Sequence, residues 1–136
     1  MNNLKMIAEH HAPYIWGGTD VKTGLDCSGY IWAAARLIFP VTRTTAADMA
    51  AGFRGWVGIT LANGLRYADE GDLPFYDWGS NRIKHVGATV RDPASGDPSL
   101  LHASSSRNRT VMVPLQGVLG KPKLVRRLNF GSAVQK

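Results

Sequence analysis

An apolar helical stripe that begins at Cys27, the only cysteine of the chain, constrains the fold most strongly. Apolar residues recur at positions 27, 30, 31, 34, 35 and 38, which is the i, i+3, i+4, i+7, i+8, i+11 spacing of one helix face. Further apolar residues flank this stripe, so the helix is expected to be buried on most sides. Asp26 stands at the N-cap position, and Pro40 is expected to end the helix.

The remaining patterns place helices early and strands late. A short helix is expected over 1–11, a glycine-containing loop over Pro13–Asp26, and a second short helix, capped by a threonine, over Thr44–Ala51. Six short apolar or alternating runs follow Gly55 and predict strands at 56–61, 72–77, 84–90, 99–104, 109–113 and 122–130. This order predicts an α+β fold in which the early helices pack on an antiparallel sheet.

Length and composition set the limits of the architecture. The 136 residues, of which 44% are apolar, predict a single domain over 1–136 with its own core. No run reaches the roughly 18 to 20 apolar residues that span a bilayer, so no membrane insertion is expected. The segment 1–11 holds charges and histidines where a signal peptide needs an apolar run of about 7 to 15 residues, so export by the usual route is not expected.

The charge balance predicts an anionic partner. Sixteen Lys and Arg against ten Asp and Glu give a net charge of +6, which would attract nucleic acid, acidic lipid or acidic wall polymers. Six cations lie near the end of the chain: Arg107, Arg109, Lys121, Lys123, Arg126 and Arg127. No aromatic stacking residues are interleaved with them, so nucleic acid is not the expected partner.

Cys27 is the candidate nucleophile. A lone cysteine excludes an internal disulfide and a multi-cysteine zinc site. The N-terminus of a helix favours negative charge, so the pKa of the Cys27 thiol is expected to fall below the roughly 8.5 of a free cysteine. The alternative, a buried structural cysteine, stays open at this point.

Two histidines in predicted strands are candidate partners of Cys27. His85 lies beside Gly87, which leaves room for a substrate or the cysteine helix to approach. If the two strands are neighbours, His102 can hydrogen-bond His85 and fix its orientation. Such a set has the nucleophile, base and orienting group of covalent catalysis.

Six ordered segments resemble the NlpC/P60 family of papain-like cysteine peptidases over roughly residues 8 to 130. They are Pro13-Tyr14-Ile15-Trp16-Gly17-Gly18, Gly24-Leu25-Asp26-Cys27-Ser28-Gly29-Tyr30, Arg43-Thr44-Thr45, Gly71-Asp72-Leu73, His85-Val86-Gly87 and His102-Ala103-Ser104. The resemblance implies a minimal papain-like fold, with the nucleophile helix packed on an antiparallel sheet. It also implies hydrolysis of peptidoglycan stem peptides, commonly between γ-D-glutamate and diaminopimelate or lysine.

The resemblance assigns roles to individual residues. Cys27 becomes the nucleophile, His85 the general base and acid, and His102 the orienting third member. The Tyr14 hydroxyl is expected to help bind the oxyanion, together with the backbone N–H of Cys27.

Two further residues match substrate-contacting positions of the family, Asp26 and Ser28, although a plain helix cap is an equal alternative for Asp26. The resemblance implies no metal and no cofactor. His10 and His11 are interpreted as a solvated helix end rather than a metal site.

Two departures from the family pattern bear on the site. Pro74 would remove a ladder hydrogen bond from a central strand, so an edge or a bulge is expected there. A polar stretch, Asp92 to Ser99, replaces the usual hydrophobic run, so the loop near the third catalytic position is expected to be remodelled.

Other functions and settings stay open. A non-catalytic wall-binding or phage-particle assembly module would retain the fold without turnover, and a related thiol amidase or acyltransferase would act on another substrate. The expected partner is the peptidoglycan stem peptide. A phage lysin, a phage tail component, an injected effector and a fragment of a larger secreted protein all fit the sequence, and it does not define the oligomeric state.

Overall fold

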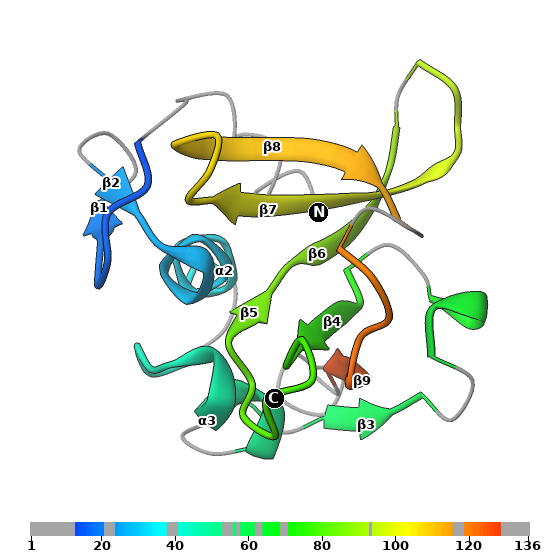
Figure 1. Cartoon of the computed structure of the whole chain (residues 1–136), viewed down its shortest axis with the longest axis horizontal. Helices are drawn as coiled ribbons and strands as arrows, with labels where there is room; N and C mark the ends of the chain where they lie inside the picture. The colour runs from blue at the N-terminus through cyan, green and yellow to red at the C-terminus, as the bar shows by residue number, and fades with distance from the viewer. Residues whose placement is uncertain are drawn as a thin grey trace.

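The computed structural model describes residues 13–20, 24–37, 41–52, 56, 58–61, 64–68, 71–92, 94–115 and 119–128. The helix expected over 1–11 and the helix-ending Pro40 lie outside the described residues. Helices occur early and strands dominate from Gly58 onward, so the α+β class is confirmed (Figure 1). No helix in the described ranges is long and apolar enough to cross a membrane.

The helix that carries Cys27 is α2 (Cys27–Ala35), and it is buried on most sides, as predicted. It begins at Asp26, whose carboxylate accepts a hydrogen bond of 2.6 Å from the backbone N–H of Gly29. A Cβ on Gly29 would lie 2.0 Å from the carbonyl oxygen of Gly18. Only glycine therefore lets the preceding loop pack this closely against the first turn of α2.

The segment expected to be a loop before α2 contains a short hairpin. Strands β1 (Thr19–Asp20) and β2 (Gly24–Leu25) pair antiparallel, and Tyr14 forms an isolated parallel bridge with Leu25. The prediction of a loop is wrong at these two short strands, because backbone pairing occurs there between residues whose side chains carry no strand pattern. The pairing anchors Tyr14 beside the start of α2.

The second helix, α3 (Ala46–Ala51), confirms the predicted threonine cap. The Thr45 side chain accepts a 3.2 Å hydrogen bond from the backbone N–H of Asp48. Gly52 ends the helix in the left-handed conformation, with a φ of 81°.

The strands form two larger antiparallel sheets. The first has the order β3 (Gly58–Thr60), β9 (Leu124–Leu128), β4 (Leu73–Tyr76) and β5 (His85–Val86). The second has the order β6 (Ala88–Arg91), β7 (Pro98–Ser104) and β8 (Arg109–Pro114). A single turn of 3-10 helix, η1 (Gly64–Tyr67), precedes β4. Figure 1 shows α2 beside β5 and β7, with which it is in contact.

The run predicted as one strand over 84–90 is divided at Gly87 into β5 and β6. A Cβ on Gly87 would lie 2.6 Å from the Leu100 side chain, so the close approach of β7 requires glycine at this position. Because of this break, β5 belongs to the four-stranded sheet and β6 to the three-stranded sheet, and Gly87 connects the two sheets directly.

Pro74 lies in the central strand β4, between β9 and β5, so the expectation of an edge or a bulge is wrong. Its carbonyl accepts a 3.2 Å hydrogen bond from the N–H of Gly87. In a hydrogen-bonded antiparallel pair the two residues exchange both bonds, so the N–H that proline lacks falls opposite Gly87. The missing bond therefore coincides with the break between β5 and β6, where the sheet pairing is already interrupted.

The core lies between the helices and the sheets. Its largest fully buried side chains are Trp56, Tyr30, Tyr76, Phe75, Leu25 and Met49. Two cations of the predicted basic cluster stabilise this arrangement internally. Arg126 donates to the carbonyls of Ala50 and Gly58, and Arg127 forms a 2.9 Å ion pair with the buried Asp72. The cluster is therefore not a continuous solvated patch.

Candidate active site

Three elements bring together the residues predicted for catalysis. Cys27 occupies the first position of α2, His85 lies in β5, and His102 lies in β7. The pairing of β6 with β7 places the strand that follows His85 next to the strand of His102. Their rings meet edge to face with centroids 5.0 Å apart, and His85 Nε2 lies 2.9 Å from His102 Nδ1. The expected contact between the two histidines is present.

The Cys27 thiol packs against the backbone on both sides of His85. Its Sγ lies 4.0 Å from the carbonyl oxygen of Lys84, and the backbone N–H of Val86 donates toward the sulfur. The Cys27 side chain is buried, with 6% of its surface exposed. Among the described residues, no hydrogen bond joins the thiol to the His85 ring.

Burial raises the pKa of the Cys27 thiol to about 11. Desolvation is the largest cause, and the negative charge of Asp26 adds to it. Hydrogen bonds from the backbone of Val86 and Ser28, and the charge of Arg43, act in the opposite direction without offsetting burial. The expectation of a lowered pKa is therefore wrong, because the helix N-terminus is covered by the sheet instead of facing water.

Both histidines are neutral at pH 7. Desolvation, followed by the charge of His102, lowers the pKa of His85 to about 3, and desolvation lowers the pKa of His102 to about 4. Trp78 contributes to this burial, since its ring stacks on His85 with centroids 5.4 Å apart and planes 21° apart. In the resting site a protonated thiol therefore lies beside an imidazole that is free to accept a proton.

We expect alkylation of Cys27 by iodoacetamide to be slower at pH 7 than that of a free cysteine and to keep rising beyond pH 9. A raised pKa leaves a smaller thiolate fraction at neutral pH, and only the thiolate reacts. Mass spectrometry of the intact protein over a pH series measures the rate, with N-acetylcysteine as the reference. A plateau already reached below pH 7 would show instead that a thiolate and imidazolium pair is formed at rest.

Tyr14 reaches the site from the segment before β1. Its backbone N–H donates a 2.9 Å hydrogen bond to the side chain of Asn108 in the β7–β8 turn. Burial, followed by the charges of Cys27 and Asp26, raises the pKa of the Tyr14 hydroxyl to about 12, and a hydrogen bond with the backbone N–H of Cys27 opposes this shift. The two donors expected at the oxyanion, the tyrosine hydroxyl and the Cys27 N–H, are therefore adjacent.

The chain's own groups occupy the carboxylate of Asp26. One oxygen accepts from the Gly29 N–H at 2.6 Å, from Ser28 Oγ at 3.2 Å and from the Arg43 guanidinium at 3.0 Å, and the other accepts from the Gly17 N–H at 2.9 Å. These bonds support the helix-cap role. Asp26 also lines the cleft, so a substrate can contact it only through the small part of its surface that is exposed there.

Arg43 is a site residue to which the sequence analysis gave no role. Its guanidinium bonds both Asp26 and Ser28, at 3.0 and 2.9 Å, and also the carbonyl of Thr44. The sequence signal for Arg43 was the Arg43-Thr44-Thr45 segment, which was noted only because it resembles the NlpC/P60 family. The guanidinium donates hydrogen bonds to Asp26 and Ser28, two polar side chains that are buried beside Cys27.

A cleft of about 800 Å³ opens over Cys27. Its walls come from the loop before β1, the start of α2, the segment through α3 and the segment before β5. The lining residues are Trp16, Gly17, Asp26, Cys27, Ser28, Arg43, Thr44, Thr45, Ala46, Ala47, Arg82, Ile83 and Lys84. This volume lies in the range of ligand-binding pockets, and the Cys27 thiol lies in the wall of the cleft.

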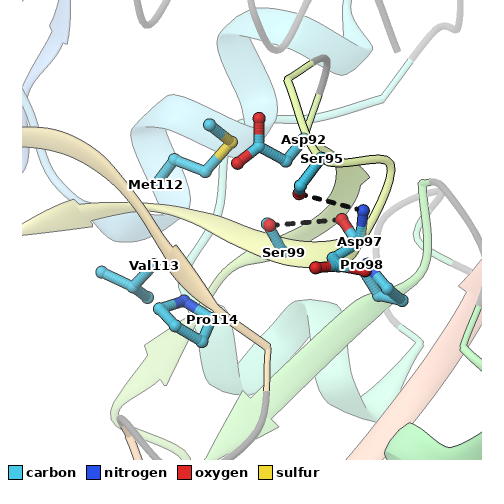
Figure 2. A pocket seen from close by; sticks show the side chains of 8 residues that line it. All are labelled: Asp92, Ser95, Asp97, Pro98, Ser99, Met112, Val113 and Pro114. Carbon is cyan, nitrogen blue, oxygen red and sulfur yellow. Dashed lines mark hydrogen bonds between the residues drawn. The ribbon is translucent and has the colours of Figure 1, made fainter.

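A second hollow, of about 200 Å³, lies at the β6–β7 loop (Figure 2). It is lined by Asp92, Ser95, Asp97, Pro98, Ser99, Met112, Val113 and Pro114, without a cysteine or histidine. Figure 1 shows this loop at the end of β7 that points away from α2. The expectation that the polar stretch remodels the region of the third catalytic position is therefore wrong, since His102 lies toward the opposite end of β7.

No group of three or more His, Cys, Asp or Glu side chains within the described ranges is arranged to hold a metal ion. His10 and His11 lie outside these ranges.

The fold and site together define a papain-like α+β domain, with a cysteine at a helix N-terminus beside two sheets that each carry one histidine. A family model described as "NlpC/P60 family" matches residues 11–128. The chain therefore belongs to the NlpC/P60 family, and the resemblance found in the sequence is confirmed.

Named relatives and solved structures agree with this assignment. The chain is 33% identical over 81 residues to the bifunctional muramidase/DL-endopeptidase CwlT of Bacillus subtilis, covering 57% of this chain and 22% of that protein. It is 31% identical over 99 residues to the probable endopeptidase YafL of Escherichia coli, covering 68% and 38%. The crystal structure of the NlpC/p60 domain of the peptidoglycan hydrolase SagA has the same fold, with a TM-score of 0.67, 20% identity and coverage of 93% and 97%. The chain spans well under half the length of the two curated relatives.

Proposed function

We propose that this protein is a cysteine endopeptidase that hydrolyses amide bonds in peptidoglycan stem peptides. The observation that carries the proposal is the 2.9 Å contact between His85 and His102, because the backbone on both sides of His85 packs against the Cys27 thiol that lines the cleft. Membership of the NlpC/P60 family supports the substrate class, since CwlT is named as a DL-endopeptidase and SagA as a peptidoglycan hydrolase.

The ring contact determines how protons move in the proposed reaction. Because His85 Nε2 faces His102, its Nδ1 is the nitrogen left to accept the proton of Cys27. His85 Nε2 must then carry a hydrogen and donate to Nδ1 of His102, which places the His102 hydrogen on Nε2. His102 thereby holds the tautomer and orientation of His85, and its neutral acceptor nitrogen stabilises the imidazolium that forms.

Catalysis then proceeds in two stages. The Cys27 sulfur attacks the scissile carbonyl carbon while His85 removes the thiol proton, and the negative oxygen is bound by Tyr14 and by the Cys27 backbone N–H. Collapse of this intermediate expels the amine, which takes the proton from His85. Water, deprotonated by His85, next attacks the thioester and releases the acid and the free thiol. The bond cut is the one that the family resemblance implies, from γ-D-glutamate to diaminopimelate or lysine.

Digestion of purified peptidoglycan tests the proposal. We expect new fragments that begin with a free α-amino group on diaminopimelate or lysine, because hydrolysis of the γ-D-glutamyl amide creates that terminus. Mass spectrometry of the released muropeptides identifies the bond. Fragments with termini at another bond would contradict the linkage, and the absence of any new terminus would contradict the peptidase proposal and favour a wall-binding module.

A further inference from the structure

Two cations in the cleft have no acidic partner among the residues that the structure describes. Arg82 and Lys84 line the same cleft as Cys27, and both are exposed. Neither forms an ion pair with any residue in the described part of the chain, whereas the third cation of the cleft, Arg43, is paired with Asp26. Within the described ranges, the wall beside Cys27 therefore carries two positive charges without an ion-pair partner.

The backbone that carries these two cations is fixed. The Lys84 N–H donates to the carbonyl of Tyr76 at 2.9 Å, and the Lys84 carbonyl lies 4.0 Å from the Cys27 sulfur. The Arg82 carbonyl accepts a 3.1 Å hydrogen bond from Ser80 Oγ. The side chains of Arg82 and Lys84 can therefore bind a ligand, while hydrogen bonds hold their backbone in place close to the Cys27 sulfur.

The segment that carries these two cations continues into His85. His85 must deliver a proton to the departing nitrogen, so the residue that supplies that nitrogen lies on the His85 side. Lys84 precedes His85 directly, and Arg82 lies two residues earlier on the same segment. The oxyanion donors, Tyr14 and the Cys27 N–H, come instead from the start of α2 and the segment before it. The segment that carries Arg82 and Lys84 thus leads into the proposed general acid, whereas the oxyanion donors come from another segment.

We propose that Arg82 and Lys84 form a carboxylate subsite that selects diaminopimelate over lysine as the residue supplying the scissile nitrogen. Diaminopimelate has the carbon skeleton of lysine with an additional carboxylate on its ε-carbon. A guanidinium and an ammonium bind that carboxylate through charge-assisted hydrogen bonds. Lysine offers only an ammonium there, which the two cations repel, so the same residues provide attraction to one substrate and repulsion of the other. This inference rests on the proposed peptidase function.

Two tetrapeptides test the subsite, L-Ala-γ-D-Glu-X-D-Ala with X as meso-diaminopimelate or L-lysine. The following D-Ala occupies the α-carboxyl group of X, so the peptides differ at that residue only in the ε-carboxylate. We expect the native protein to have a kcat/KM at least about tenfold higher for the diaminopimelate peptide. The double variant R82Q/K84Q is expected to bring the ratio of the two values close to one.

A third peptide separates the two carboxylates of the substrate. With D-isoglutamine in place of D-glutamate, the α-carboxylate on the acyl side is removed and the ε-carboxylate stays. We expect the double variant to lower kcat/KM on this peptide as much as on the parent peptide. If the effect of R82Q/K84Q disappears when this α-carboxylate is removed, the cations bind the acyl side and the assignment to diaminopimelate is overturned.

The matched control is R109Q/K121Q, which removes the same two positive charges from exposed positions that do not line the cleft. We expect its preference to equal that of the native protein. An equal loss of preference in both double variants would show a net-charge effect and overturn the subsite. The subsite would also be overturned if the native protein cleaved both peptides equally well, but the proposed peptidase function would then still hold. Failure to cleave either peptide, or any bond in peptidoglycan, would overturn the proposed function together with the subsite.

Discussion

Replacing Cys27 with alanine is expected to abolish peptide hydrolysis, with a fall in kcat of about 10⁴-fold or more. The reason is that a methyl group can neither attack the scissile carbonyl nor form the thioester, so the remaining groups supply only binding and oxyanion stabilisation. The measurement is the initial rate of release of the amino-terminal fragment from a γ-D-glutamyl peptide, followed by chromatography.

The fold should survive this change, because alanine suits the first turn of a helix and the Sγ atom is a minor part of the core. Thermal unfolding followed by circular dichroism checks that point. The matched control is Ala33→Cys in the C27A background, which restores a thiol to α2 at a buried position away from His85 and should not restore hydrolysis. A C27A variant that cleaves as fast as the parent would refute the role of Cys27 and leave it as a structural cysteine.

Replacing His102 with alanine is expected to lower kcat by about 10² to 10⁴-fold while changing KM much less. His102 is a positioning residue, since it touches His85 at 2.9 Å and not the thiol. Without it, His85 loses the acceptor that holds its tautomer. We expect H102N, which retains a short polar side chain, to recover part of the loss.

The pH profile distinguishes this positioning role from a general loss of stability. The low pKa of His85, about 3, keeps it neutral and able to act as a base, so activity should fall only as pH drops through the pKa of the free enzyme's histidine pair. Removing His102 relieves the desolvation that is the largest cause of the low pKa of His85 and also takes away the charge of His102, and we expect these two changes to outweigh the lost hydrogen bond to the imidazolium. The acid limb of kcat/KM in H102A should therefore move to higher pH, and an unchanged limb would count against the positioning role.

The stacking of Trp78 on His85 shows how the tertiary structure adjusts the proposed base. Trp78 adopts a left-handed conformation with a φ of 50°, which a bulky residue rarely does, and its indole N–H donates to the carbonyl of Leu119 at 3.0 Å. These contacts hold the ring over His85 even though the residue is half exposed. The sequence pattern contained no signal for this contact, because a single tryptophan in a polar turn is typical of an exposed residue.

Local signals in the sequence were sufficient to find the candidate nucleophile and to predict its helix. The apolar stripe from Cys27 and the carboxylate of Asp26 depend on residues close together in the chain, and periodicity and capping chemistry report them directly. The threonine cap of α3 and most strands could be predicted for the same reason. The order of Cys27, His85 and His102 was also visible, because motif order is a property of the sequence.

The geometry of the site required the tertiary structure. The contact of His85 with His102 depends on the register of β6 on β7 and on the break at Gly87, which pattern alone does not set. The same holds for Pro74, whose missing N–H is tolerated because it falls opposite that break.

The sequence by itself thus determined the fold class, the family and the identity of the candidate nucleophile, because each follows from local periodicity, capping and motif order. The tertiary structure decided which cations of the cleft have an ion-pair partner among the described residues, and it decided that the Cys27 thiol rests protonated. Both depend on burial and on distances between residues far apart in the chain. Desolvation by the covering sheet outweighs the field of the helix N-terminus, and no local pattern encodes that balance.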